Sequence, residues 1–308
     1  NNTAVGYNPD PDYDYPTFGG GGGIYQEWSD SLEIYDSEIS NNIAVNAPGG
    51  GIAIYLSNDI IIDNIILNNN SSLGGGGGVM FLRTDNVLFE NSTIANNISQ
   101  ENSGGGIFIG SESGLASIVI NATFNRLSIF NNHAMGGGGI FSWSAILNLY
   151  HSTLAQNEAT NSEWSGGGLA SHYVSEPNII NSLFYNNIPN SIHNGYQQTP
   201  ILVAYSLIQE WWAGSGNLID INPLFCDPDS GDYSLAENSP CVGTGEDGAN
   251  MGAFDIGCDA IILNISDELV PVTYTLHQNY PNPFNPVTTL RYDLPENDMI
   301  NITIYDML

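Results

Sequence analysis

Glycine runs recur along the first two-thirds of the chain at nearly constant spacing, and this period constrains the fold more than any other feature. The last glycine of each run stands at position 23, 51, 78, 106, 139 or 168, so the steps are 28, 27, 28, 33 and 29 residues. An aliphatic residue follows every run, at Ile24, Ile52, Val79, Ile107, Ile140 and Leu169. A unit of this size cannot bury its own apolar face, so successive units must stack on one another.

A second set of positions repeats inside each unit. The segments SEISNNIA, NIILNNNS, STIANNIS, LSIFNNHA, STLAQNEA and SLFYNNIP align without gaps. One apolar column of this alignment contains Ile39, Ile66, Ile94, Ile129, Leu154 and Phe184. A second apolar column, five residues earlier, contains Ile34, Ile61, Phe89, Phe124, Leu149 and Ile179. Three residues after the first column asparagine occurs in every unit: Asn42, Asn69, Asn97, Asn132, Asn157 and Asn187. We expect the apolar columns to face the interior and the asparagines to hydrogen-bond between stacked units.

The composition of the units selects one class of repeat fold. Short β-prone segments separated by glycine and asparagine predict strands, and the glycine runs predict corners with positive φ or close backbone approach. Leucine-rich repeats are shorter and dominated by leucine, whereas propeller blades need about 40–45 residues. The two apolar columns lie an odd number of residues apart, which requires a bend between them. The sequence therefore predicts an all-β protein, with a parallel β-helix over residues 1–200.

The repeated patterns GGG-Φ-x-Φ and S-x-Φ-x-x-N-x-A, where Φ is apolar, resemble those of a known group. They are similar to the right-handed β-helix repeats of bacterial surface proteins, including polymorphic outer-membrane proteins and pectate-lyase-like folds. The resemblance implies a right-handed parallel β-helix, but it implies no activity because the shared positions are structural. The first residues, Asn1 to Ala4, match Asn41 to Ala44, so we expect the chain to start inside a coil, with further repeats before it.

Residues 201–260 depart from the repeat. The segment ILVAYSLI at 201–208 predicts one last coil, and the segment from Asn222 to Asp259 resembles the closing segment of many secreted β-helix proteins. We expect it to cover the open end of the solenoid, since an uncovered sheet end pairs with other chains. The three cysteines, at 226, 241 and 258, predict one disulfide and one free thiol in an oxidising compartment. Cys226–Cys241 is the preferred pair, and Cys241–Cys258 is the alternative.

The last part of the chain has a different character. Residues 261–273 are predicted to be a linker, and residues 274–308 contain the string QNYPNPFNP at 278–286. This string resembles the opening of the type A C-terminal sorting domain of the type IX secretion system in Bacteroidetes-like bacteria. The resemblance implies export by the type IX machinery, a secreted or outer-membrane-surface location and the first strands of a β-sandwich domain. Family members continue past the IYDxLG element, within which this chain stops, so we expect a partial domain.

The charge of the chain excludes several partners. Three arginines and no lysines face 33 acidic residues, for a formal net charge of -30. Such a field repels phosphate backbones, anionic membrane surfaces and polyuronates, so nucleic acid is not an expected partner. No apolar stretch reaches the length of a membrane span, so membrane insertion is not expected either.

The candidate site residues form one polar column and two acidic turns. The column lies between the two apolar columns and contains Asp36, Asp63, Asn91, Arg126, His151 and Asn181. If it faces outward, Asp36 and Asp63 are candidate Ca²⁺ ligands, and Arg126 or His151 is a candidate base of a lyase-like site. The alternative is a row of bend residues that hydrogen-bond to the backbone. The turns, Asp10, Asp12, Asp14 and Asp227, Asp229, Asp232, are either Ca²⁺ sites or solvated acidic loops. No cofactor is required.

Two functions follow from these features. The first is a secreted or cell-surface structural or adhesive protein that presents an acidic surface to glycans, cells or cations. The alternative is a lyase or glycoside hydrolase acting on polysaccharide along the polar column. Histidines occupy unrelated places in the repeat, which disfavours nucleophilic catalysis. Aromatic residues are candidates either for stacking on sugar rings or for packing: Trp28, Trp143, Trp164, Trp211 and Trp212.

Overall fold

The computed structural model describes residues 2–5, 20–111, 120–161, 166–195, 199–262, 275–276, 292–293 and 301–303. Its contacts divide the chain into two units, Asn1–Ile261 and Ile262–Leu308. In the second unit, β32 (Thr275–Leu276) pairs antiparallel with β33 (Tyr292–Asp293). The string at 278–286 that suggests a sorting domain lies outside the described residues, so that domain stays a prediction.

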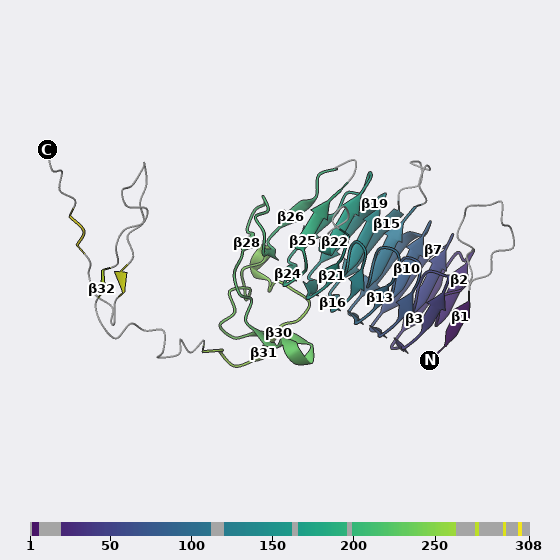
Figure 1. The fold of residues 1–308 in the computed structure, drawn as a ribbon, viewed down its shortest axis with the longest axis horizontal. Coiled ribbons are helices and arrows are strands. Elements are labelled where there is room, and N and C mark those ends of the chain that lie inside the picture. The colour runs from purple at the N-terminus through teal and green to yellow at the C-terminus, as the bar shows by residue number, and fades with distance from the viewer. Residues whose placement is uncertain are drawn as a thin grey trace. The chain divides into compact units, whose positions relative to one another are not determined.

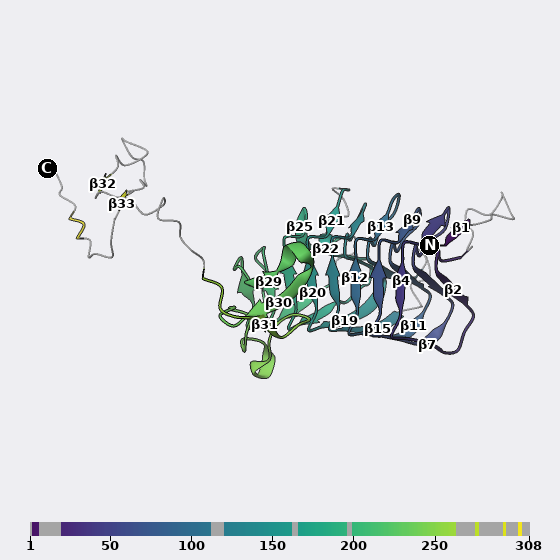
Figure 2. The same cartoon turned by 90° about the horizontal axis from the view of Figure 1, so that it is seen from below.

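The first unit is a parallel β-solenoid whose coils build four sheets, with the last coil contributing no strand to the first of them (Figures 1 and 2). Sheet A contains β1 (Thr3–Val5), β5 (Ile43–Val45), β9 (Ser71–Ser72), β13 (Ile98–Ser99), β17 (His133–Ala134) and β21 (Glu158–Ala159). Sheet B contains β2 (Ile24–Glu27), β6 (Ile52–Tyr55), β10 (Val79–Leu82), β14 (Ile107–Gly110), β18 (Ile140–Trp143), β22 (Gly166–His172) and β25 (Asn190–Asn194).

The other two sheets complete each coil. Sheet C contains β3 (Leu32–Tyr35), β7 (Asn58–Asp63), β11 (Asp85–Glu90), β15 (Ile120–Asn125), β19 (Ala145–Tyr150), β23 (Asn178–Ile180) and β26 (Leu202–Ala204). Sheet D contains β4 (Glu38–Ser40), β8 (Ile66–Asn68), β12 (Thr93–Ala95), β16 (Ser128–Phe130), β20 (Thr153–Ala155), β24 (Leu183–Tyr185), β27 (Leu207–Ile208) and β28 (Leu218–Ile219). The prediction of an all-β parallel solenoid is confirmed.

The glycine period correctly predicts the register of sheet B. The aliphatic residues that follow the glycine runs pair in order from Ile24 to Leu169. All of them except Ile24, in the first coil, are buried in one continuous core. The corners before them also behave as predicted, because Gly49, Gly76 and Gly104 have φ of 67°, 72° and 75°.

The predicted columns are wrong by one residue in the second repeat of the solenoid. Sheet D pairs Ile39 with Leu67 and Leu67 with Ile94, whereas Ile66 is 46% exposed. Sheet C likewise places Ile62, not Ile61, between Ile34 and Phe89. The segment from Ile65 to Asn70 contains two isoleucines, a leucine and three asparagines in a row, so two gap-free alignments fit it almost equally well.

The buried asparagine ladder therefore consists of Asn42, Asn70, Asn97, Asn132, Asn157 and Asn187. In each step the backbone N–H and the side-chain Nδ2 of one asparagine donate to Oδ1 of the next, at 2.9–3.1 Å. Asn69, predicted to belong to the ladder, is exposed and has φ of 54°. It is the corner residue before the ladder, a place that asparagine tolerates well.

The end of the solenoid is covered by a segment other than the predicted one. Tyr205 N–H donates to the Ser215 carbonyl at 2.8 Å, and Ser206 N–H donates to Asn217 Oδ1 at 3.1 Å. Trp212, between them in sequence, packs against the main core. The residues after 208 thus bond to the last coil and extend sheet D by one more parallel strand, β28, which pairs with β27.

The segment predicted to cover that end lies along the outer face of sheet D instead. It forms β29 (Phe225–Asp227), β30 (Asp232–Ala236), β31 (Ile256–Cys258) and two 3₁₀ turns, η1 (Pro228–Ser230) and η2 (Glu246–Gly248). Tyr233 packs on Phe130 with 4.9 Å between ring centroids, and Ala253 N–H donates to Thr153 Oγ1 at 3.0 Å. A second apolar core joins this segment to sheet D. None of the helices in the described ranges is long and apolar enough to cross a membrane.

The disulfide joins Cys226 to Cys258, so both predicted pairs are wrong, although one bond and one free thiol were expected. The bonded residues lie on β29 and β31, which flank β30, and their Cα atoms are 5.8 Å apart. Cys241 is instead fully buried in the second core. Burial there raises the pKa of its thiol to about 12.

The outer face of sheet B contains a row of stacked rings. His172 stacks on Phe141 at 5.1 Å and on Trp143 at 6.4 Å between centroids, and His193 lies 5.6 Å away. His172 is only 3% exposed. Desolvation, followed by the nearby His193, lowers the pKa of His172 from 6.5 to about 4.

This histidine makes the stability of the protein depend on pH. Because its folded pKa is depressed, its stabilising contribution is complete above pH 6.5 and is lost as the pH falls towards 4. In His172→Phe, the loss of unfolding free energy over that interval should be smaller than in the unmodified protein, by on the order of 2 kcal/mol. Urea denaturation at several pH values measures both slopes. Equal slopes would contradict the prediction.

Candidate functional site

The predicted polar column lies at the corner between sheets C and D and consists of bend residues with positive φ. The structure places Asn64, not Asp63, in line with Asp36, because of the same one-residue shift. Asn64 Nδ2 donates to Asp36 Oδ1 at 2.6 Å, and Asn91 Nδ2 donates to Asp63 Oδ1 at 2.8 Å. These carboxylates thus bond to amides of the next coil.

Asn181, the last residue of this column, forms hydrogen bonds to the segment from Glu246 to Gly252. Asn181 Oδ1 accepts from Glu246 N–H and its carbonyl accepts from Gly252 N–H, both at 2.7 Å. His151 Nε2 lies 3.4 Å from Asn181 Nδ2. Desolvation and then the charge of Arg126 lower the pKa of His151. Asn181 therefore binds the segment from Glu246 to Gly252 to the solenoid, and His151 lies beside its amide.

The predicted metal ligands that the structure describes do not gather into a site. Within the described ranges there is no group of three or more His, Cys, Asp or Glu side chains that could hold a metal ion. Asp227, Asp229 and Asp232 follow one another around the turn from β29 to β30, where Asp232 Oδ1 accepts from Ser234 N–H at 3.0 Å. Asp10, Asp12 and Asp14 lie outside the described residues. Calcium binding stays a prediction.

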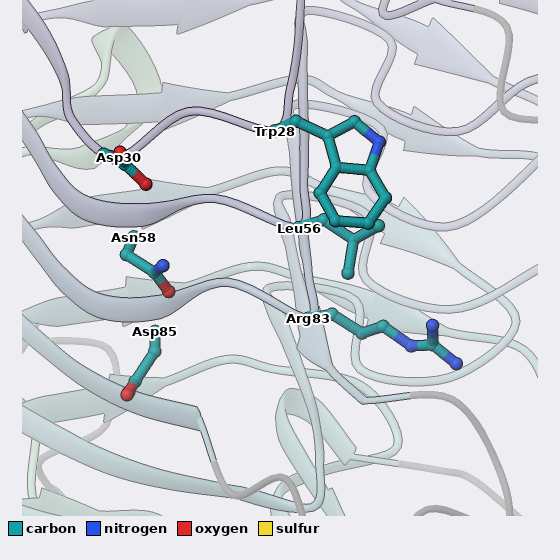
Figure 3. Close-up of a pocket in the computed structure, with 6 residues that line it drawn as sticks. All are labelled: Trp28, Asp30, Leu56, Asn58, Arg83 and Asp85. Atoms are coloured by element: carbon teal, nitrogen blue, oxygen red, sulfur yellow. The ribbon is translucent and has the colours of Figure 1, made fainter.

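A groove of about 410 Å³ lies at a different corner, between sheets B and C (Figure 3). One wall contains Trp28, Leu56 and Arg83, which directly follow β2, β6 and β10. The other wall contains Asp30, Asn58 and Asp85, which lie before or at the start of β3, β7 and β11. Each wall therefore takes one residue from each of three successive coils, and neighbouring residues are separated by about 4.8 Å of solenoid axis.

The first wall is built from side chains that are unfavourable at their positions. Trp28, Leu56 and Arg83 have φ of 56°, 47° and 52°, a left-handed conformation that costs a residue with a side chain about 1–2 kcal/mol. At the corner between sheets D and A the same conformation is occupied by asparagine, which tolerates it, in five coils, at Asn41, Asn69, Asn96, Asn131 and Asn186, and by Gln156 in a sixth. Backbone bonds to the next coil hold the strained residues, as from Trp28 N–H to the Tyr55 carbonyl at 3.2 Å. The same conformation recurs at this corner beyond the groove, at Ser144 and Tyr173, so it belongs to the turn of the solenoid and does not by itself mark a site.

The second wall presents carboxylate and amide groups. Asp85 Oδ1 accepts from Asn121 N–H and Nδ2 and from Asn86 N–H, at 2.9–3.0 Å. Burial alone raises the pKa of Asp85, but these hydrogen bonds outweigh it and lower the pKa below its usual value. The side chains of Asp30 and Asn58 are exposed, and in the described part of the chain they make no hydrogen bond to protein. Elsewhere, acidic and amide residues of neighbouring coils pair with each other, as Asp36 does with Asn64.

The aromatic residues proposed to stack on sugars differ in position. Trp28 is 73% exposed and stands at the groove, whereas Trp211 is 78% exposed and lies outside it. Trp143 belongs to the stacked rings of sheet B, Trp212 packs on the core, and Trp164 lies outside the described residues. Sequence reasoning missed the groove as a site, although Trp28, Leu56 and Arg83 are separated by 28 and 27 residues, which is the period of the repeat.

Comparison of this chain with family models, curated proteins and solved structures finds no match in any of the three.

Proposed function

We propose that this protein is an extracellular structural or adhesive solenoid that binds a glycan in the groove between sheets B and C. The observation that carries the proposal is a pair of neighbouring ladders that line one groove, Trp28, Leu56 and Arg83 in one and the hydrogen-bonding groups of Asp30, Asn58 and Asp85 in the other. Pyranose rings have apolar faces that pack on aromatic rings and hydroxyl edges that bond to carboxylates and amides. A groove with both kinds of group, open along the solenoid axis, suits an elongated sugar chain.

Binding is favoured over hydrolysis by the state of Asp85. Glycoside hydrolases need a carboxylic acid whose pKa is raised so that it can donate a proton. Hydrogen bonds lower the pKa of Asp85, so it does not fit the role of that proton donor. The alternative, a polysaccharide-active enzyme, predicts new reducing ends when the protein is incubated with a glycan that it binds.

Removing the indole of Trp28 should weaken glycan binding about tenfold or more, because a well-placed tryptophan contributes roughly 2 kcal/mol or more. Trp28→Ala and Trp211→Ala remove equally exposed side chains, one inside the groove and one outside. Affinity electrophoresis against a panel of neutral and charged polysaccharides measures both. Only Trp28→Ala should lose retardation on a glycan that retards the unmodified protein. Equal loss in both variants, or in neither, would contradict a binding role for the groove.

The cellular setting belongs to the same proposal. The string at 278–286 supports export by the type IX machinery of a Bacteroidetes-like bacterium, and the net charge of -30 supports a partner that is not polyanionic. The disulfide is consistent with an oxidising compartment. At the cell surface, a rigid solenoid with a lateral groove would hold the cell or its secreted matrix to glycan.

A further inference from the structure

We propose that the groove prefers a β-1,4-linked glycan with free amino groups, and that Asp30 and Asp85 receive the ammonium groups of alternate sugars. This inference rests on the proposed glycan-binding function and adds the chemical class of the ligand. Three observations carry it: the charge of the second wall, the spacing of its carboxylates and the position of the indole.

The charge of the second wall favours a cation. Asp85 is bonded through Oδ1 to three N–H donors, which keep it ionised and leave its other oxygen for a ligand. Asp30 is exposed, and in the described part of the chain its carboxylate has no hydrogen bond or ion pair with protein. The stick view shows the Arg83 side chain directed away from Asp85 (Figure 3). An ammonium group between such carboxylates gains charge-assisted hydrogen bonds.

The spacing of the carboxylates fits a sugar chain. Asp30 and Asp85 are separated by two coils, with Asn58 between them, so they lie about 10 Å apart along the axis, twice the distance between neighbouring strands. In an extended β-1,4-linked chain, successive sugars are turned over, and the same substituent points to the same side at every second sugar. The length of two such sugars is close to the rise of two coils along the solenoid axis. Alternate amino groups therefore meet carboxylates, and the intervening sugar meets the Asn58 amide.

The indole of Trp28 sets the position of the chain. Trp28 and Asp30 come from the same coil and each lines one wall of the groove, with the indole extending away from the wall that contains Asp30 (Figure 3). A sugar stacked on Trp28 therefore lies level with Asp30 along the solenoid axis. The long-range field of a chain with net charge -30 adds attraction for a cationic polymer and repels a polyuronate.

The test compares three oligosaccharides of equal length: glucosamine, N-acetylglucosamine and glucose, all β-1,4-linked. Isothermal titration calorimetry is performed in buffer of physiological ionic strength, at a pH where the amine is protonated. The glucosamine oligomer should bind about tenfold more tightly than the others, as expected for two partly exposed ion pairs. In Asp30→Asn, which is nearly isosteric, the ratio of the affinities for the glucosamine and glucose oligomers should fall about threefold to fivefold.

Glu237→Gln is the matched control, because it also removes one exposed negative charge but lies far along the sequence from the groove residues. An equal fall in Glu237→Gln and Asp30→Asn would show that the preference comes from net charge alone and would overturn the inference. Equal binding of all three oligomers, still dependent on Trp28, would overturn the amino-sugar preference and leave the glycan-binding groove intact. Binding of none of them, or of the polysaccharide panel, would overturn the proposed function itself.

Discussion

Replacing Gly105 by alanine should destabilise the protein by at least about 4 kcal/mol, a loss outside the usual range of single substitutions. A Cβ atom at this position would lie 2.4 Å from the Gly138 carbonyl oxygen and 2.6 Å from both N and O of His133. All three atoms belong to the backbone of the next coil, so no side chain can move aside to make room. The coils would have to separate, and the hydrogen bonds of sheets A and B at that level would lengthen.

Gly248→Ala serves as the control for Gly105→Ala. Gly248 has φ of 78°, and a Cβ atom there would meet no atom within 4 Å. That substitution carries backbone strain alone, about 1–2 kcal/mol, whereas Gly105→Ala carries the steric clash alone. Urea denaturation followed by circular dichroism compares the two midpoints. A smaller shift in Gly105→Ala than in Gly248→Ala would mean that the coils are not stacked as described.

Sequence reasoning predicts the solenoid because its main determinant is periodic. Glycine is required where a Cβ atom would meet the backbone of the next coil, as at Gly50, Gly77 and Gly105, so the glycine runs recur in the coils and fix the register of sheet B. In the second repeat, three consecutive asparagines make the corner residue and the ladder residue look alike, so the predicted alignment places Asn69 in the ladder. Neighbouring units aligned on the glycines would have placed Asn70 nineteen residues after Gly51, as Asn42 lies nineteen after Gly23.

The candidate site was not predicted, because its residues share a position and not a residue type. Trp28, Leu56 and Arg83 occupy the same corner in three coils but have no chemical property in common. The cysteine pairing was missed for a related reason. The Cys226–Cys258 pairing depends on the contact of β31 with β30, and no local sequence pattern between Cys241 and Cys258 predicts that contact. Contacts made by non-repeating segments need three-dimensional information that periodicity does not supply.

Asn70→Ala should cost about 3–5 kcal/mol, the second large effect expected in this chain. Its Oδ1 accepts from N and Nδ2 of Asn42, both at 3.0 Å, and its Nδ2 donates to the Ile39 carbonyl at 2.8 Å. Alanine would leave these three groups without partners in a region where Asn70 is 1% exposed. Each buried polar group left in this way costs about 1–3 kcal/mol, partly offset where a neighbour relaxes.

Asn69→Ala makes the comparison decisive, since it changes the adjacent residue in the same way. Asn69 is the exposed corner residue, so alanine should cost only the left-handed strain, about 1 kcal/mol. The gap-free alignment predicts the opposite order, with Asn69 in the ladder and Asn70 outside it. Because stacked repeats can unfold in parts, hydrogen exchange of the Asn42 amide should accompany the denaturation midpoints. Faster exchange in Asn70→Ala than in Asn69→Ala is expected, and the reverse order would restore the register read from sequence.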